Sequence, residues 1–372
     1  MATKTGQTIA LCMIVKNEVH VIKRALESVI NFVDYVSICD TGSTDGTQEA
    51  IRGFLEEHDL DGEVFDRPWV NFAHNRTECF DLAEGKADYI LTLDADEVLY
   101  KFVDNEPVHE YETEIPALVH EAYDVLSVFG NNRYTRAQFF KNSRKWKWIG
   151  VVHEYAMPVD GEWSRGRLDH ICNFPRNEGA RSKDSRKCYR DALILENWLI
   201  DHPNDVRELF YLGQSYMDDG AQAKAIEPMK KAAELTHWDE EKYMLFLRLA
   251  RCYRDLGEED NSVKYFIKAH EARPQRREAA TELAAYYRSK EQYNMAAAVC
   301  DSTLRHAIPN DVLFVEHDCH NWRIKDEAAL AYYYTGRFED ALKISQDCID
   351  MAPESEKKRL TENIDGYRRA LK

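Results

Sequence analysis

Two acidic motifs in the first half of the chain carry the side chains best suited to chemistry. Asp94 and Asp96 follow the apolar run 89–93 and are two residues apart. Two carboxylates at the end of a buried strand are costly unless a cation or hydrogen-bond donors lie close to them. A divalent ion that takes oxygen ligands and keeps positions open for phosphates would satisfy both. The pair therefore predicts a metal and phosphate site, with a solvated turn as the alternative.

The second motif is the octet 40–47, which begins at Asp40 directly after the predicted strand 35–39. Its two glycines permit a tight turn, and the polar residues 43–45 can cap the helix that follows. Asp40 is not needed as a cap. Its carboxylate can therefore accept a hydrogen bond from a base N–H or a ribose hydroxyl.

The elements around both motifs alternate between strand and helix. The continuous apolar run 8–15 predicts a strand covered on both faces, and 19–32 has the spacing of an amphipathic helix. The strand 35–39, a helix through Leu55 and the strand 89–93 continue the alternation. This order predicts a parallel sheet with helices on both faces. Ligands bind such sheets beyond the carboxyl ends of the strands, which is where both motifs fall.

The second half has a different period, with amphipathic helices and almost no strand signal from about residue 185. A helix–turn–helix template of about 34 residues fits four times. Its small-residue position falls at Gly213, Ala250, Ala284 and Ala329. Small residues let paired helices approach closely, and an insertion near 308–320 interrupts the last interval. The pattern resembles a tetratricopeptide array of about four repeats, with a generic helical bundle as the alternative.

Composition narrows the class of protein. The 372 residues carry a net charge of −17, with 44% apolar and 31% charged residues, which is typical of soluble globular proteins and excludes a generally basic nucleic-acid binder. No apolar run approaches the ~18 residues of a membrane span. The nine scattered cysteines include no CxxC pair and favour reduced thiols in a cytoplasmic protein.

The motifs, in their order along the chain, resemble the family-two glycosyltransferases of the GT-A fold. The resemblance rests on 16–18, on the octet from Asp40 and on 93–97, and it continues through Asn75-Arg76, 139–142 and 148–154. It is strongest with a subgroup in which tetratricopeptide repeats follow a compact catalytic domain. It implies a Rossmann-like α/β GT-A domain over 1–175, a linker over 176–183 and an all-α repeat solenoid over 184–372.

The resemblance also implies the donor site. Asp40 would contact the nucleotide base, Asp94 would contact the ribose or the metal, and Asp96 would ligate Mn²⁺ or Mg²⁺ on the diphosphate. His170 would complete the metal site, and Gly150 would let the backbone approach the donor sugar. Further donor contacts are implied for Asn17, Glu18, Arg76, Lys187 and Arg190, the last two as a pair on one helix face that closes over the diphosphate.

Glu154 is similar to the base that deprotonates the acceptor hydroxyl. Many relatives place an Asp after an acidic residue where this chain has His153-Glu154, so His153 remains the alternative base. Alternatively, Glu154 has a structural role only and forms an ion pair with a nearby arginine. Departure of a nucleoside diphosphate builds negative charge that a divalent cation and basic residues stabilise, and a single displacement inverts the anomeric centre.

We therefore expect a metal-dependent, inverting hexosyltransferase that uses a nucleotide sugar, with UDP as the first candidate. The acceptor hydroxyl can belong to a protein, a glycan, a lipid-linked sugar or a modified base. The repeats would place the acceptor, bind a protein partner or mediate oligomerisation. Basic and aromatic residues interleave over 133–148, a pattern that suits a nucleic acid or a sugar face. The competing functions are a nucleotidyltransferase, which would need a Gly- and Arg-rich signature after the first strand, and a non-catalytic repeat scaffold.

Overall fold

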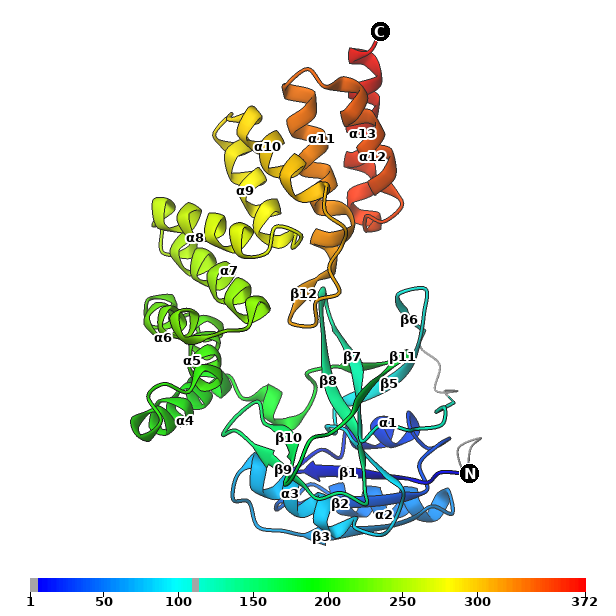
Figure 1. The fold of residues 1–372 in the computed structure, drawn as a ribbon. Helices are drawn as coiled ribbons and strands as arrows, with labels where there is room; N and C mark the ends of the chain where they lie inside the picture. The colour runs from blue at the N-terminus through cyan, green and yellow to red at the C-terminus, as the bar shows by residue number, and fades with distance from the viewer. Residues whose placement is uncertain (1–5, 109–113) are drawn as a thin grey trace. The chain divides into compact units, whose positions relative to one another are not determined.

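The computed structural model describes residues 6–108 and 114–372, which divide into two compact units (Figure 1). The first unit is Met1–Trp198 and the second is Leu199–Lys372. The first contains a mixed β-sheet with helices on both faces, and the second is almost entirely helical. The predicted order of an α/β domain followed by an all-helical region is confirmed.

The first strands of the sheet are parallel, as predicted. β1 (Ile9–Val15) lies between β2 (Tyr35–Asp40) and β4 (Tyr89–Thr92), and β3 (Asp61–Asp66), which the sequence pattern did not reveal, extends this side beyond β2. Every residue of β1 except Ile14 is buried, because the strand is covered on both faces.

Helices cover both faces of these strands. α1 (Ile22–Glu27) and α2 (Thr47–Glu57) pack with Ile9, Leu11 and Met13 in one apolar core. α3 (Phe72–Leu82) packs with Ala10 and Cys12 on the opposite face. The alternation along β1 thus supplies two cores, one on each side of the sheet.

The rest of the sheet is largely antiparallel, so the expectation of a purely parallel sheet was wrong for this part. The order β3-β2-β1-β4 continues as β8-β7-β11-β5-β6. The added strands are β5 (Glu97–Val103), β6 (Glu106–Val108), β7 (Ala122–Phe129), β8 (Asn132–Lys141) and β11 (Arg165–Pro175). A separate hairpin joins β9 (Trp146–Ile149) to β10 (Tyr155–Pro158). β8 pairs with β4 in an antiparallel register that places Leu91 opposite Phe139.

The predicted linker 176–183 belongs to the first unit, which ends at Trp198 rather than at residue 175. The linker contains the short helix η1 (Ala180–Lys183), and α4 (Lys187–Asp201) follows it. This segment is bonded to the sheet: Arg176 N–H donates to Asp96 O, and the Glu178 carboxylate forms an ion pair with Arg24 at 2.5 Å. These bonds explain why the compact unit extends past the predicted boundary.

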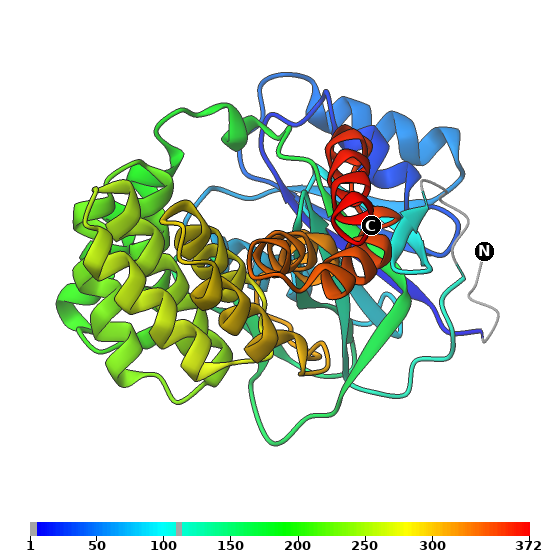
Figure 2. The same ribbon diagram turned by 90° about the horizontal axis from the view of Figure 1, so that it is seen from above.

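The second unit contains the predicted helix pairs (Figure 2). The pairs are α5 (Val206–Asp218) with α6 (Gln222–Leu235), α7 (Asp239–Asp255) with α8 (Glu259–Ala272), α9 (Glu278–Ser289) with α10 (Tyr293–Leu304), and α11 (Ile324–Tyr334) with α12 (Phe338–Ile349), followed by α13 (Glu354–Ala370). A Cβ on Gly213 would lie 2.4 Å from Met229 Cγ, so this repeat needs glycine at the small-residue position, where the other three have alanine. No helix within the described ranges is both long enough and apolar enough to cross a bilayer.

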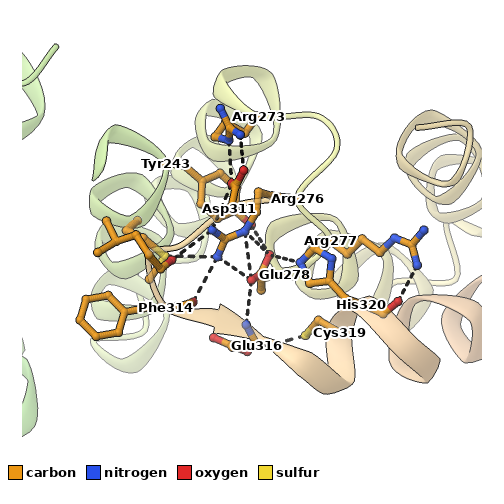
Figure 3. Close-up of polar contacts among 12 residues, drawn as sticks. Tyr243, Arg273, Arg276, Arg277, Glu278, Asp311, Phe314, Glu316, Cys319 and His320 are labelled. Atoms are coloured by element: carbon orange, nitrogen blue, oxygen red, sulfur yellow. Dashed lines mark hydrogen bonds and ion pairs between the residues drawn. The ribbon is translucent and has the colours of Figure 1, made fainter. Parts of the chain in front are cut away.

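The predicted insertion between α10 and α11 is anchored by buried charges (Figure 3). The Glu278 carboxylate accepts from Arg276 Nη2 at 2.6 Å, from the Tyr243 hydroxyl at 3.0 Å and from Glu316 N–H at 3.0 Å, and its Oε2 lies 3.2 Å from His320 Nε2. Asp311 pairs with Arg273 and Arg276. Arg276 and Glu278 are fully buried, so this insertion is a fixed part of the repeat unit.

The segment 316–320 is an ordered part of this anchor. Cys319 and His320 are buried and begin the π-helical turn Cys319–Arg323 that leads into α11. Glu240 of α7 also holds this segment, since its carboxylate accepts from Val312 N–H at 2.8 Å and Leu313 N–H at 2.9 Å. The insertion is therefore held by residues far apart in the sequence.

Candidate active site

The loops after β1 and β2 interlock at the carboxyl edge of the sheet. Asn17 N–H donates to Ser43 Oγ at 2.8 Å, and Thr44 N–H donates to Asn17 Oδ1 at 2.8 Å. Asn17 has a left-handed backbone with φ 59°, which asparagine tolerates better than most residues. The predicted donor residue Asn17 therefore shapes the loop that surrounds the site.

Asp40 ends β2 and has one engaged oxygen and one unpaired oxygen. Oδ1 accepts from Gly42 N–H at 2.8 Å and Ser43 N–H at 2.7 Å. Oδ2 is buried and has no hydrogen-bond partner within the described part of the chain. Asp40 thus fixes the turn without capping α2, and it retains an oxygen that a ligand N–H or O–H could satisfy.

Arg76 of α3 joins two of the predicted site residues. Its Nη2 lies 2.5 Å from Asp94 Oδ1, and its Nε lies 2.5 Å from Glu154 Oε1. The guanidinium is centred 5.1 Å from the Trp148 ring and is largely buried. Burial opposes its charge, but the two carboxylates outweigh that effect and raise the pKa of Arg76. The arginine is therefore a permanent cation at the centre of the site.

Asp94 sits among several positive charges. Burial opposes its ionisation, but the guanidinium groups of Arg76 and Arg136 outweigh burial and lower its pKa to about 2. Arg136 also pairs with the buried Glu97, whose Oε2 accepts from Asp94 N–H at 3.0 Å. Burial raises the pKa of Glu97 despite this partner. Asp94 is thus an ionised acceptor whose side chain is still 37% exposed.

Asp96 and Glu18 approach each other around Gly179. Gly179 N–H donates to Asp96 Oδ2 at 2.9 Å, and Ala180 N–H donates to Glu18 Oε1 at 3.0 Å. A Cβ on Gly179 would lie 3.0 Å from Asp96 Oδ2 and 3.3 Å from Glu18 Oε1. Burial raises the pKa of Glu18, and the charge of Asp96 adds to that rise against the Ala180 hydrogen bond. The two carboxylates are therefore close and incompletely neutralised.

This carboxylate pair agrees in type with the divalent ion expected from the sequence. Oxygen ligands are those that Mg²⁺ and Mn²⁺ prefer. Over residues 6–108 and 114–372, no three His, Cys, Asp or Glu side chains are grouped to hold a metal. Asp96 with Glu18 beside it would thus need the phosphate oxygens of a ligand to complete a coordination shell.

The structure does not bring His170 to Asp96. β11 runs antiparallel to β5 with Pro175 opposite Glu97 and Ile171 opposite Lys101. His170 therefore lies six residues along the sheet from Asp96, or about 20 Å at ~3.3 Å per residue. Its Nε2 lies 2.9 Å from Glu114 O instead. The predicted pairing of these two residues on one metal does not fit this register.

Glu154 lies at the end of the loop 150–154, which connects β9 to β10. Gly150 begins this loop with φ 104°, and His153 has a left-handed backbone with φ 55°. Glu154 Oε1 is bonded to Arg76, and no described residue donates to its Oε2. The ion pair expected as its structural alternative is present, and one oxygen remains available. His153 is exposed, and it is not the residue that Arg76 engages.

Lys187 and Arg190 share the first turn of α4, but Arg190 is engaged elsewhere. Its Nη2 lies 2.6 Å from Asp184 Oδ2, and its side chain is 63% exposed. Arg181 belongs to the same basic stretch after His170 and acts on the site itself, because its charge helps to lower the pKa of Asp94. Arg181 also pairs with Asp191 and lies 4.4 Å above the Phe72 ring.

The basic and aromatic residues of 133–148 do not form a binding surface. Trp146 and Trp148 are buried in the core beside α3. The basic side chains pair separately, for example Arg144 with Glu121 at 2.7 Å and Lys145 with Glu84 at 2.6 Å. The stretch does not support the expected stacking of a nucleic acid or a sugar. Successive side chains of β8 and β9 point to opposite faces, so the tryptophans are buried while the basic residues form separate ion pairs.

Sequence reasoning missed the role of Arg136. Leu91 pairs with Phe139 in the antiparallel register of β4 and β8, which places position 136 opposite position 94. A strand assignment for 132–141 with that register would have identified the contact. Glu97, by contrast, was visible as the last residue of the acidic motif, and its buried pairing with Arg136 became apparent only in the fold.

Two family models match this chain. Residues 10–149 match the family described as glycosyl transferase family 2, and residues 245–276 match a tetratricopeptide repeat. The mixed sheet of the first unit is consistent with the GT-A fold that the motifs predicted, and the helix pairs of the second are consistent with the repeats.

Several known proteins are similar to parts of the chain. A TPR repeat-containing protein of Synechococcus elongatus is 25% identical over 70% of this chain and 65% of its own length. Uncharacterized glycosyltransferases of Rickettsia felis and Rickettsia bellii are each 34% identical, over 27% and 28% of this chain. The chain spans only 32% and 33% of those two relatives.

Among solved structures, the crystal structure of MamA aligns with 49% of this chain and 92% of its own, at 20% identity and a TM-score of 0.35. The structure of YrrB, described as a TPR protein with an unusual peptide-binding site, aligns with 45% of this chain and 80% of its own, at 16% identity and a TM-score of 0.34. The family matches therefore indicate a glycosyl transferase family 2 domain over 10–149 and a tetratricopeptide repeat over 245–276.

Proposed function

We propose that this chain transfers a hexose from a nucleotide sugar to an acceptor hydroxyl with inversion at the anomeric carbon. The observation that carries the proposal is Arg76, which holds Asp94 and Glu154 together at the carboxyl edge of the sheet. Ligands of such sheets bind at this edge. The family 2 domain over 10–149 supports the same reaction class.

The donor would bind with its base at Asp40 and its ribose at Asp94. The unpaired Asp40 Oδ2 can accept a ring N–H, and uracil offers one such donor, so a UDP-sugar is the first candidate. Asp94 is ionised and partly exposed, and it can accept from a ribose hydroxyl. Leaving a buried carboxylate oxygen unpaired is unfavourable, so base binding would remove that penalty.

Glu154 would act as the general base through Oε2. The acceptor hydroxyl loses its proton to Glu154 as its oxygen bonds to the anomeric carbon, and the bond from that carbon to the diphosphate oxygen breaks. The electron pair of that bond leaves with the diphosphate. Arg76 touches the base and would be a positioning residue, because its bond to Oε1 fixes the carboxylate orientation. His153 remains the alternative base.

A divalent ion, Mn²⁺ or Mg²⁺, held by Asp96 with Glu18 beside it would supply positive charge to the leaving diphosphate. Before the donor arrives, the chain neutralises these carboxylates in part with the N–H groups of Gly179 and Ala180. The segment around Gly179 would therefore exchange these bonds for ligand contacts. The repeat unit would place the acceptor or bind a protein partner.

The test is a panel of nucleotide sugars incubated with the full chain, with and without Mn²⁺. We expect slow release of nucleoside diphosphate from one of the donors, because water can replace an absent acceptor, and we expect Asp94→Asn to reduce that release. Binding of a donor without any release would favour a non-catalytic role. Absence of both binding and release for every donor would contradict the proposal.

A further inference from the structure

An open apolar pocket of about 350 Å³ lies beside the loop that carries Glu154. It is lined by Val151 of that loop and by α4 residues Leu193, Ile194, Asn197 and Trp198. All five belong to the first unit. Leu193 and Ile194 are 45% and 42% exposed. Apolar side chains left this open on a helix next to a reactive group are characteristic of a ligand subsite.

The pocket is within reach of the proposed base. Val151 and Glu154 are three residues apart in the loop 150–154, so their Cα atoms are at most about 11 Å apart. An extended peptide covers that span in about three residues at ~3.3 Å each. A side chain one to three positions from a reacting hydroxyl could therefore enter the pocket while the hydroxyl meets Glu154.

The lining selects among acceptor classes. Asn197 supplies the one polar side chain among the five lining residues, and its amide can both donate to and accept from a peptide backbone. A sugar has several hydroxyls, and an apolar lining would leave most of them without partners. The volume is near the lower limit for ligand pockets, ~300 Å³, and is large enough for one branched or aromatic side chain.

We infer that this pocket is an acceptor subsite, and that the acceptor is a peptide with a large apolar residue within about three positions of the hydroxyl that receives the sugar. The inference rests on the proposed glycosyl transfer. It adds the class of acceptor and the residues that select it, Leu193 and Ile194 foremost.

The test uses the full chain, the nucleotide sugar that supports donor hydrolysis, and synthetic peptides with one central Ser in a Gly and Ala background. Each peptide carries Leu, Phe or a second polar residue at one flanking position. We expect transfer to the Leu and Phe peptides to exceed transfer to the polar ones by about tenfold or more, the effect of an apolar group in a fitted pocket. Ile194→Ser and Leu193→Ser should remove that preference while leaving donor hydrolysis unchanged.

Ile200→Ser is the matched control, because Ile200 lies on the same helix, is 74% exposed and does not line the pocket. It should retain the preference. Anisotropy of a labelled Leu peptide gives a second readout, and its binding should weaken in Ile194→Ser. The inference is overturned if the preference is absent, if it survives both pocket variants, or if only glycans or lipids accept the sugar. Loss of donor hydrolysis in the wild-type chain would instead contradict the proposed function itself.

Discussion

Each unit of this protein contains a buried arginine that holds two carboxylates, and the two clusters differ in access. In the repeat unit Arg276 binds Glu278 and Asp311, whose side chains are 0% and 2% exposed. In the first unit Arg76 binds Asp94 and Glu154, and Asp94 is 37% exposed. Residue types and spacing alone therefore do not separate an anchor from a site.

The carboxylates of the two units differ in how many of their oxygens accept a hydrogen bond. Both oxygens of Glu278 accept hydrogen bonds, from Tyr243, Arg276 and Glu316 among others. In the first unit, no described residue donates to Glu154 Oε2, and Asp40 at the same edge of the sheet has one oxygen buried without a partner. A native protein rarely leaves such an atom unsatisfied without a reason. In the closed cluster of Arg276, Glu278 and Asp311, the bonded carboxylates fix the path of the insertion, although His320 Nδ1 beside them has no partner among the described residues. In the open cluster of Arg76, Asp94 and Glu154, with Asp40 at the same edge of the sheet, carboxylate oxygens remain for a ligand.

The largest expected effect is on the closed cluster. Glu278→Gln removes the charge that compensates the fully buried Arg276, and breaking a buried ion pair costs about 3–5 kcal/mol. Urea unfolding of residues 199–372, followed by helical circular dichroism, measures this loss. Glu282→Gln is the control: its side chain is 20% exposed and pairs with Arg251, so it should lose much less. Equal losses would show that burial does not distinguish the pairs.

The open cluster should respond in ligand binding rather than stability. Asp40→Asn keeps an oxygen for the Gly42 and Ser43 N–H groups but can present an amide where a base N–H would bind. We expect the affinity for the donor to fall by about 10- to 100-fold, from ~1–3 kcal/mol for an unpaired buried group. Calorimetry with UDP checks this, with Asp45→Asn as a loop control. Unchanged affinity for UDP would show that Asp40 does not contact the donor.

The pH dependence of stability gives a smaller effect. The pKa of Asp94 is lowered from 3.8 to about 2, so its contribution is complete above pH ~4 and is lost as the pH falls towards ~2. After allowance for solvent screening at its exposed side chain, the contribution is about 1 kcal/mol. Asp94→Asn should therefore reduce the change in the free energy of unfolding of the first unit between pH ~4 and ~2. The same pH dependence of unfolding in the wild type and the variant would contradict the lowered pKa of Asp94.

The smallest effect on stability concerns Arg190. Its pair with Asp184 lies at the surface, and such pairs contribute less than about 1 kcal/mol. Arg190→Met should leave unfolding nearly unchanged and weaken donor binding if the guanidinium moves to the diphosphate. Arg186→Met provides a neighbouring control. Unaltered donor affinity would identify the Lys187 and Arg190 face as solvated surface.

The features that could be predicted are those that depend on residues close together in the sequence. Asp40, Asp94 and Asp96 could be placed at strand ends because an apolar strand and the turn after it are adjacent in the chain. The helix pairs were visible because small residues such as Gly213 recur at a fixed period. The attachment of the predicted linker 176–183 to the sheet was not visible, because its backbone bonds to Asp96 and Glu18 are not encoded in composition.

Contacts that depend on strand register could not be predicted. The position of Arg136 opposite Asp94 follows from the antiparallel pairing of β8 with β4. The distance of His170 from Asp96 follows from the pairing of β11 with β5. Both registers join segments far apart in the sequence, and a shift of one residue would have reversed the faces.

The most direct test of the account is sugar transfer by Glu154→Gln, compared with His153→Ala. Gln keeps the shape of Glu154 and a bond to Arg76 but cannot take a proton. We predict that Glu154→Gln lowers transfer by ~10²- to 10⁴-fold while donor affinity stays near wild type, and that His153→Ala retains most transfer. Normal transfer by Glu154→Gln, together with loss of transfer but not of donor binding in His153→Ala, would contradict the role assigned to Glu154 in the open cluster.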